Sequence, residues 1–566
     1  MKFVFDMVHH NPGEPPFATA FSQPAKLVEY GYNGQVFKHI NCIATFEAFD
    51  KDIFPEGSPD KAWIDDFSQH IVQEIAAAKA AGLEVYFHVD LFVLPTRLVD
   101  KYRDQLCDQN GRISIHKPLT LEVHRVMFDE LTRRFPEVDG YIIRVGETYL
   151  YDTPYHCGNA PIPWKRGTRQ DEQAAYVALL QFLREQVCVR NGRRIFFRTW
   201  DLFPDRIHAT APYYLEVSNQ IEPHENLYFS IKHTTLDFWR YMKFNECLTA
   251  GRHKQVVEVQ CQREYEGKGA YPDYFMHGVI DSFEENAVPK GLRDIINHPL
   301  VAGIFTWTRG GGWYGPYITN EFWPDLNAYV IAQWAMDTSR SEESIFMEYM
   351  EDKLGLSVAD AERFREISLL SARAVLLGRY CGPYDRADEG RLPNNLWMRD
   401  DRLGGLKPDA DKPTLIGQLD DVFEYLRANN GFDEALAEKR QCVELWQQMK
   451  KLFSQITTLA DSSLREQIAA QIEYGLRLFG VIDAGWQIMV MGYVGDKASK
   501  YNTDKLAKAI GEYDRLWKHY NNLPADAPCC ATLYKDIYFA TPGTPQPPGL
   551  GATVERYRER LVSCHR

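Results

Sequence analysis

Eight short apolar segments recur along the first part of the chain, separated by stretches in which apolar residues recur at helical spacing. The predicted strands are 3–8, 34–41, 83–91, 140–147, 193–200, 227–232, 255–262 and 301–308. Eight strands alternating with helices predict an α/β fold in which a parallel sheet closes into a (β/α)8 barrel. The alternative is a doubly wound open sheet. That fold would more usually carry a Gly-rich phosphate loop after the first strand, where this chain has His9-His10-Asn11-Pro12-Gly13.

Beyond about residue 340 the alternation stops and only helical patterns remain. These predicted helices are 344–353, 359–379, 415–429, 432–459, 463–489 and 504–519. We therefore predict a catalytic barrel over 1–335 and a helical C-terminal domain over 336–566. The segment 381–413 is rich in Gly, Pro, Asp and Arg and is too long for a simple connection. We expect it to reach back over the barrel mouth and narrow the site.

The composition limits the kinds of partner this chain can have. Its net charge of −14 argues against nucleic acid or an anionic membrane, because both need a basic face. The first residues show no apolar leader, and we find no run of about 18 apolar residues that would span a membrane. The 11 cysteines are scattered without a CxxC pair, which favours reduced thiols. A cytoplasmic protein is expected.

The helical region also carries broad apolar faces. One such face contains Tyr474, Leu476, Leu478, Phe479 and Ile482. It predicts either a homodimer through the C-terminal domain or the internal core of a helical bundle, and the pattern alone does not separate the two.

Three acidic residues lie at or just after the ends of predicted strands: Glu147, Asp237 and Glu264. The C-terminal ends of barrel strands carry the chemistry of this fold. Cleavage of a glycosidic bond needs an acid for the leaving oxygen and a carboxylate that activates water or attacks directly. We interpret Glu147 as the proton donor, with Glu264 and Asp237 holding and deprotonating the water in an inverting reaction. Each acid alone could instead form a salt bridge or cap a helix.

Cations gather near the same predicted strand ends, at Arg144, Arg198, Lys232 and Arg309. They could bind a substrate carboxylate, which Arg reads bidentately and Lys as a point charge. They could also pair with the catalytic acids and tune them. Trp313, in the aromatic cluster after the eighth strand, could stack on a sugar or pack in an aromatic rim. No metal or other cofactor is expected, because no HxH or HExxH pattern accompanies the histidines.

Two stretches resemble motifs of the family 67 glycoside hydrolases, the α-glucuronidases. Residues 258–267, EVQCQREYEG, resemble that family's ELQxxxEYxG strand, and residues 231–238, IKHTTLDF, resemble its IKxxxxDF segment. The resemblance implies that Glu264 and Asp237 share the role of base and that Lys232 binds the uronate.

Two further strands resemble the family more loosely. Residues 196–199, FFRT, are similar to its motif with a uronate-binding Arg, here Arg198. Residues 140–147, GYIIRVGE, are similar to the strand that carries its acid, although Arg144 replaces a Lys and Glu147 is shifted by about one place. Family members also carry an N-terminal β-rich domain before the barrel, and this chain begins on the barrel.

The resemblance implies an exo-acting enzyme that releases a terminal uronic acid from oligosaccharides, with α-linked glucuronic or 4-O-methylglucuronic acid as the expected sugar. Two other classes stay open. One is a barrel glycosidase acting on a neutral sugar or a hexosaminide, although substrate-assisted hexosaminidases have adjacent acids where this chain has Val145-Gly146-Glu147. The other is a carbohydrate-binding protein without catalysis.

Overall fold

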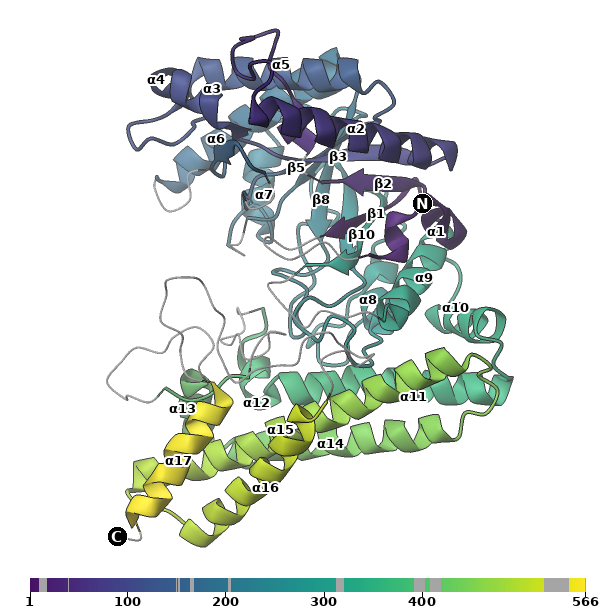
Figure 1. The fold of residues 1–566 in the computed structure, drawn as a ribbon, viewed down its shortest axis with the longest axis vertical. Helices are drawn as coiled ribbons and strands as arrows, with labels where there is room; N and C mark the ends of the chain where they lie inside the picture. The colour runs from purple at the N-terminus through teal and green to yellow at the C-terminus, as the bar shows by residue number, and fades with distance from the viewer. Residues whose placement is uncertain are drawn as a thin grey trace.

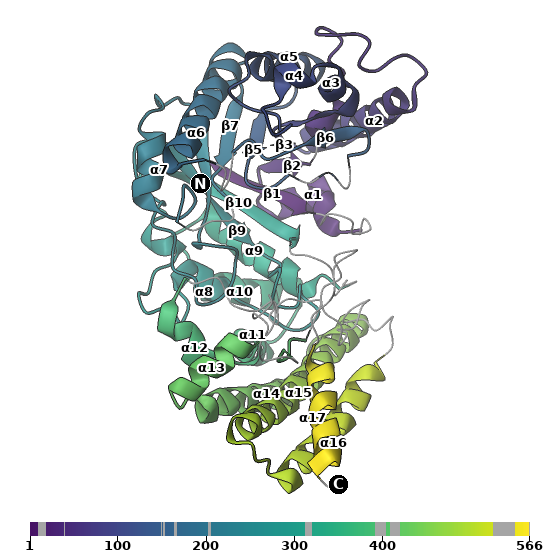
Figure 2. The same ribbon diagram turned by 90° about the vertical axis from the view of Figure 1, so that its left-hand side faces the viewer.

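The computed structural model describes residues 1–9, 18–38, 40–148, 150, 153–162, 167–201, 205–311, 320–390, 403–407, 419–523 and 549–564. A barrel with its surrounding helices forms one half of the molecule, and a layer of long helices forms the other (Figure 1). Seen from the side, α11, α14 and α15 run close together beneath the barrel (Figure 2).

Eight parallel strands close the barrel in the order β1-β10-β9-β8-β7-β5-β3-β2. They are β1 (Phe3–His9), β2 (Gly34–Phe37), β3 (Glu84–Asp90), β5 (Gly140–Arg144), β7 (Arg194–Arg198), β8 (Leu227–Lys232), β9 (Lys254–Gln260) and β10 (Val301–Gly310). Because β1 pairs with both β2 and β10, the sheet has no edge, and the open-sheet alternative is excluded. All eight predicted strands are confirmed. The sequence did not predict a small antiparallel sheet of β4 (Val93–Pro95) and β6 (His156–Gly158).

Helices surround the barrel between its strands. They are α1 (Pro24–Tyr30), α2 (Pro59–Ala80), α3 (Thr96–Lys101), α4 (Arg103–Leu106), α5 (Pro118–Arg134), α6 (Arg169–Leu183), α7 (Ala211–Ser218), α8 (Met276–Asp281) and α9 (Phe322–Met336), with short turns Ala20–Ser22, Ile40–Ile43, Arg184–Arg190 and Leu292–Asp294. Local sequence determines where α2 begins. The Ser58 side chain accepts a hydrogen bond from the N–H of Lys61, and Pro59 occupies the first helical position.

Only helices and connecting segments are described after α9. They are α10 (Glu342–Glu348), a π-type turn (Tyr349–Lys353), α11 (Val358–Arg379), α12 (Gly382–Asp385), a short turn (Arg386–Asp388), α13 (Asp420–Ala428), α14 (Phe432–Ser454), α15 (Ser462–Ala498), α16 (Thr503–Asn521) and α17 (Leu550–Cys564). The fold class, a barrel followed by a helical region, is confirmed. The sequence did not predict α17, and the domain boundary at residue 335 stays a prediction.

The longest helix, α15, forms the core of the helical region. By length and composition alone it could cross a membrane, but 78% of its most apolar 18-residue window is buried inside the protein. Tyr474, Leu478, Phe479 and Ile482 are buried, and Leu476 packs against the same core. The chain's own helices therefore cover the apolar face from which a homodimer was predicted, and the homodimer stays untested.

Alternation along the strands determines what the barrel encloses. Aromatic side chains fill its centre, among them Phe5, Tyr86, Phe196, Tyr228 and Phe305. Residues two apart on a strand point to the same face of the sheet. Arg198 follows Phe196 by two residues on β7, and Lys232 follows Tyr228 by four on β8, so both side chains continue the interior series towards the carboxyl ends of the strands.

Candidate active site

One pocket opens at the carboxyl ends of the barrel strands. Its described lining consists of His9, Arg144, Glu147, Arg198, Trp200, Lys232, Asp237, Glu264, Tyr265 and Trp307. The structure thus brings together the three predicted catalytic acids and three of the predicted substrate-binding residues. Arg309 is not part of this described lining and pairs with Glu321 at 2.5 Å. Trp313 lies outside the described residues.

The three acids reach the pocket from three different loops. Glu147 lies three residues beyond β5, Asp237 five residues beyond β8, and Glu264 four residues beyond β9. Two strands, β7 and β8, separate β5 from β9. Glu147 and Glu264 therefore approach the pocket from strands three positions apart, one short of the four that would place them directly across the eight-stranded barrel.

Glu147 is held by a tryptophan that the sequence did not single out. The indole Nε1–H of Trp200 donates a hydrogen bond to Glu147 Oε2 at 3.0 Å. Gly146 makes this approach possible, because a Cβ there would lie 2.0 Å from the carbonyl oxygen of Trp200. The available signal was an aromatic residue two positions after the inward-facing Arg198, at the end of the fifth predicted strand.

Asp237 forms an ion pair with Lys232 and accepts a hydrogen bond from the hydroxyl of Tyr265 at 3.2 Å. The Lys232 ammonium lies 3.5 Å from the centre of the Trp200 ring and 5.4 Å from that of Trp307, distances that allow cation–π attraction. Its side chain is 1% exposed. Beyond Asp237, the ammonium makes no hydrogen bond within the described residues, so donors remain for a ligand.

Glu264 depends on close packing with Gln260 and Gly311. Its backbone N–H donates to Gln260 Oε1 at 3.0 Å, which fixes the turn after β9. Gly311 has a φ of +92°, and a Cβ there would lie 2.9 Å from Glu264 Oε2 and 2.6 Å from Gln260 Nε2. Glycine at 311 therefore leaves room for the Glu264 carboxylate.

The two arginines of the pocket are bound to carboxylates inside the barrel. Arg144 pairs with Asp90, with Nε and Oδ1 separated by 2.5 Å. Arg198 binds Glu258 through Nε and Nη2, both at 2.8 Å. All four side chains are at most 2% exposed. The predicted pairing of the cations with the three candidate acids is seen for Lys232 and Asp237. Arg144 and Arg198 instead pair with Asp90 and Glu258, which the sequence did not predict.

These pairs set the charge of the site. Burial alone would raise the pKa of Glu258, but the charge and hydrogen bonds of Arg198 hold it below its usual range. The Nη1 of Arg198 makes no hydrogen bond within the described residues and remains available to a ligand. With Asp90 and Glu258 counted, five carboxylates surround the three cations Arg144, Arg198 and Lys232.

His9 forms part of the pocket wall. Its ring stacks on Trp307 with centroids 5.1 Å apart. Burial, followed by the charges of Lys38 and Arg144, holds the pKa of His9 well below its usual range, so the ring is neutral. Within the part of the chain that the structure describes, no group of three His, Cys, Asp or Glu side chains is arranged to hold a metal ion.

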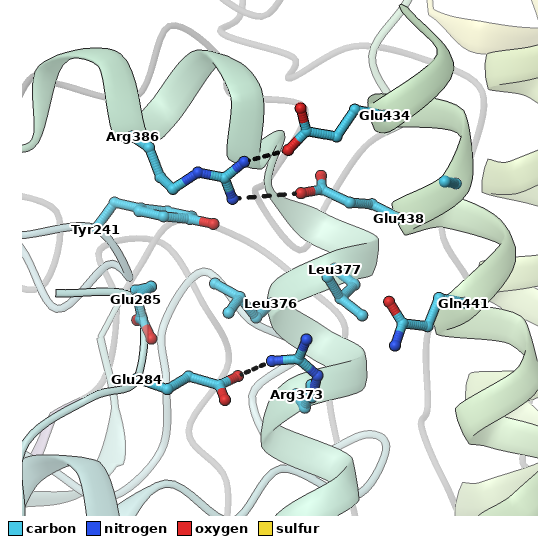
Figure 3. Close-up of a pocket in the computed structure, with 11 residues that line it drawn as sticks. Tyr241, Glu284, Glu285, Arg373, Leu376, Leu377, Arg386, Glu434, Glu438 and Gln441 are labelled. Atoms are coloured by element: carbon cyan, nitrogen blue, oxygen red, sulfur yellow. Dashed lines mark hydrogen bonds and ion pairs between the residues drawn. The ribbon is translucent and has the colours of Figure 1, made fainter. Parts of the chain in front are cut away.

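A second pocket, of about 440 Å³, lies between barrel loops and the helices α11 and α14 (Figure 3). Its charged side chains bind one another: Arg373 pairs with Glu284 at 2.6 Å, and Arg386 pairs with Glu434 and with Glu438. Because this pocket lies away from the strand ends and its described charges are paired, the candidate active site is the pocket at the barrel mouth.

The predicted loop 381–413 is described only in part, over Cys381–Gly390 and Leu403–Lys407. Its first part contacts barrel loops, since the N–H of Gly390 donates to the carbonyl of Tyr241 at 3.0 Å. Its central residues lie outside the described part of the chain, and the predicted cover over the barrel mouth stays untested.

Known proteins resemble this chain in structure and not in sequence. No protein-family model matches the chain, and no curated protein matches it in sequence. A solved structure of a GH138 enzyme targeting pectin rhamnogalacturonan II matches 95% of this chain at 12% identity, with a TM-score of 0.59. The match covers 62% of that enzyme, so the chain spans less than two thirds of its length.

Two other structures are less similar. A mutant of the Thermobaculum terrenum O-GlcNAc hydrolase matches 99% of this chain and covers 94% of its own at 10% identity, with a TM-score of 0.41. The catalytic domain of a Paenibacillus polymyxa β-amylase matches 60% of this chain and covers 99% of its own at 10% identity, with a TM-score of 0.34. The likeness to the GH138 enzyme shows a shared fold. The resemblance to family 67 stays a prediction.

Proposed function

We propose that this protein is an exo-acting glycoside hydrolase that releases a terminal uronic acid from oligosaccharides with inversion, the preferred sugar being α-linked glucuronic or 4-O-methylglucuronic acid. The observation that carries the proposal is the convergence of Glu147, Asp237 and Glu264 with Lys232 and Arg198 in one pocket at the barrel mouth.

In the proposed reaction, Glu147 protonates the glycosidic oxygen as the bond from that oxygen to the anomeric carbon breaks. A water attacks the anomeric carbon from the opposite face, and Glu264 takes its proton while Asp237 helps to hold it. The indole of Trp200 donates a hydrogen bond to Oε2 of Glu147. Oε1 makes no hydrogen bond within the described residues and can carry the transferred proton.

The charged side chains of the pocket bear directly on whether the sugar is a uronate. The ammonium of Lys232 and the Nη1 of Arg198 offer donors to a carboxylate. The GH138 enzyme targets pectin rhamnogalacturonan II, which makes fragments of that polysaccharide useful first substrates to test. Against this, the five carboxylates around three cations favour an uncharged sugar. A glycosidase for a neutral glycone is therefore the second candidate.

The decisive experiment is a screen of uronic-acid-decorated oligosaccharides for released uronate, alongside the matching neutral glycosides. Uronate release with little activity on the neutral analogues supports the proposal, and equal activity on both contradicts the uronate assignment. Proton NMR of the first-formed sugar reports its anomeric configuration, and retention of configuration rules out the inverting mechanism.

The Glu147→Gln variant tests the acid. We expect a loss of about 10²–10⁴-fold in kcat on substrates with poor leaving groups, and a much smaller loss on activated aryl glycosides, which need no protonation. Glu284→Gln, a similar change at a half-exposed residue of the second pocket, is the control and should keep full activity. A protein that binds sugars equally well before and after Glu147→Gln, without turnover, is a binding protein instead.

A further inference from the structure

Tyr380, directly after α11, joins two loops of the barrel mouth through a single hydroxyl. Its side chain is fully buried. The hydroxyl accepts a hydrogen bond from the backbone N–H of Arg240 at 3.0 Å and donates one to Glu266 Oε1 at 2.5 Å. Arg240 belongs to the loop after β8, and Glu266 to the loop after β9. One oxygen atom from the helical region therefore connects two barrel loops.

These loops carry two of the three acids in the pocket. Asp237 precedes Arg240 by three residues, and Glu264 precedes Glu266 by two. On the pocket side the loops also meet directly, because the hydroxyl of Tyr265 donates to Asp237 at 3.2 Å. The relative position of the two acids thus depends on how these loops are fixed to one another.

Buried charges reinforce the connection. Glu266 accepts hydrogen bonds from Nε and Nη2 of Arg263 at 3.1 and 3.2 Å. The guanidinium of Arg240 binds Glu285 and donates to the carbonyl of Ala372, in α11, at 3.1 Å. Burial, followed by the charge of Glu266, holds the pKa of Tyr380 well above its usual range, so its hydroxyl remains a donor.

The helical region holds the loop after β9 at further points. The side-chain amide of Gln471, in α15, donates to the carbonyl of Gly269 at 2.8 Å. The hydroxyl of Ser371, in α11, accepts the backbone N–H of Tyr274 at 3.1 Å. Of these ties, the one through Tyr380 lies nearest in sequence to Glu264 and also reaches the loop of Asp237.

We propose that Tyr380 is a positioning residue that sets the relative placement of Asp237 and Glu264, so that the helical region completes the active site without touching substrate. This inference rests on the proposed hydrolase function. Because catalysis is sensitive to displacements of about 1 Å in the reacting groups, loss of the hydroxyl should affect turnover more than substrate binding.

The test compares Tyr380→Phe with Tyr329→Phe in the full-length protein. Tyr329 is the matched control: its side chain is also buried and its hydroxyl also donates to a glutamate, Glu348, at 2.5 Å, but its ring packs against Tyr30 and Tyr349. In Tyr380→Phe we expect faster amide hydrogen exchange in residues 233–245 and 261–275, a kcat lower by about 10–100-fold, and a KM within about twofold of wild type. Tyr329→Phe should change none of these.

The proposal is overturned if Tyr380→Phe leaves exchange in both loops unchanged, or if the loops loosen while kcat stays the same. If Tyr380→Phe does not fold, Glu266→Gln weakens the same connection from the other side and gives the same comparison. If the wild-type protein releases no sugar from any glycoside, the proposed function fails, but the exchange measurements still decide whether Tyr380 holds the two loops together.

Discussion

Trp200 and Glu147 form a hydrogen-bonded pair at the candidate site, with the indole Nε1 donating to Oε2 at 3.0 Å. The bond engages Oε2, whereas Oε1 makes no hydrogen bond within the described residues. Trp200→Phe removes the donor and keeps a ring beside Lys232, so we expect kcat to fall roughly 10-fold as Glu147 loses its orientation. Steady-state kinetics measure this. Trp334→Phe, at a buried indole N–H that makes no hydrogen bond within the described residues, is the control. Equal kcat for wild type and Trp200→Phe would show that the bond has no role in turnover.

Gly311 gives a second prediction. A Cβ at this position would contact Gln260 and the Glu264 carboxylate, and φ is +92°. Gly311→Ala should therefore lower kcat strongly, by about 10²-fold, because Glu264 must move. Gly355→Ala carries the same kind of backbone cost, with φ +66°, but its Cβ would meet nothing within 4 Å. Both variants should lose some stability, and only Gly311→Ala should lose activity. A similar loss of activity in both would refute the steric explanation.

Much of this architecture follows from patterns visible in the sequence. The eight strands were predicted because apolar runs and helices alternate. Lys232 was singled out because it ends such a run, and Glu264 because it follows one. The acidic partners of Arg144 and Arg198 were not predicted from the sequence. Arg198 on β7 reaches Glu258 on β9 across the intervening strand β8, and a local sequence pattern does not show which side chains two strands apart will meet. The contact of Tyr380 with Glu266 joins residues more than a hundred positions apart, which local spacing cannot reveal.

The pair of Arg198 and Glu258 leads to a prediction about stability. Arg198→Ala removes the partner of a fully buried carboxylate, which should destabilise the protein by about 3–5 kcal/mol. Urea unfolding measures this loss, and the double variant Arg198→Met with Glu258→Gln should recover much of it. A double variant no more stable than Arg198→Ala would contradict the explanation. Arg198→Ala therefore cannot by itself test uronate recognition.

Asp6 gives a prediction about pH. Burial raises its pKa from 3.8 to about 7, against the opposing hydrogen bonds from Thr306 and Thr308. Between about pH 4 and 7 the folded protein keeps a proton that the unfolded chain releases. The contribution of Asp6 to stability is therefore complete below pH 4 and declines as the pH rises to 7. Asn at position 6 cannot titrate. The free energy of unfolding of Asp6→Asn minus that of wild type should therefore increase from pH 5 to pH 8.

Urea unfolding of both proteins at pH 5, 6, 7 and 8 checks this difference, in which the titration of all other groups cancels. If the free energy of unfolding changes with pH in the same way for both proteins, Asp6 ionises normally in the folded state.

The pairing of β1 with β10 has a consequence for synthesis. The barrel cannot close until the chain has been made as far as residue 310, and Tyr380, whose hydroxyl links the loops that carry Asp237 and Glu264, has not been made at that point. At roughly 5–20 residues per second, the chain from Gly310 to Tyr380 takes about 4–14 s to synthesise. During that interval a nascent chain can form a closed barrel in which Tyr380 does not yet hold Asp237 and Glu264 in their relative positions. Under the role proposed for Tyr380, the site becomes able to catalyse the reaction only after the barrel has closed, once α11 and Tyr380 have emerged.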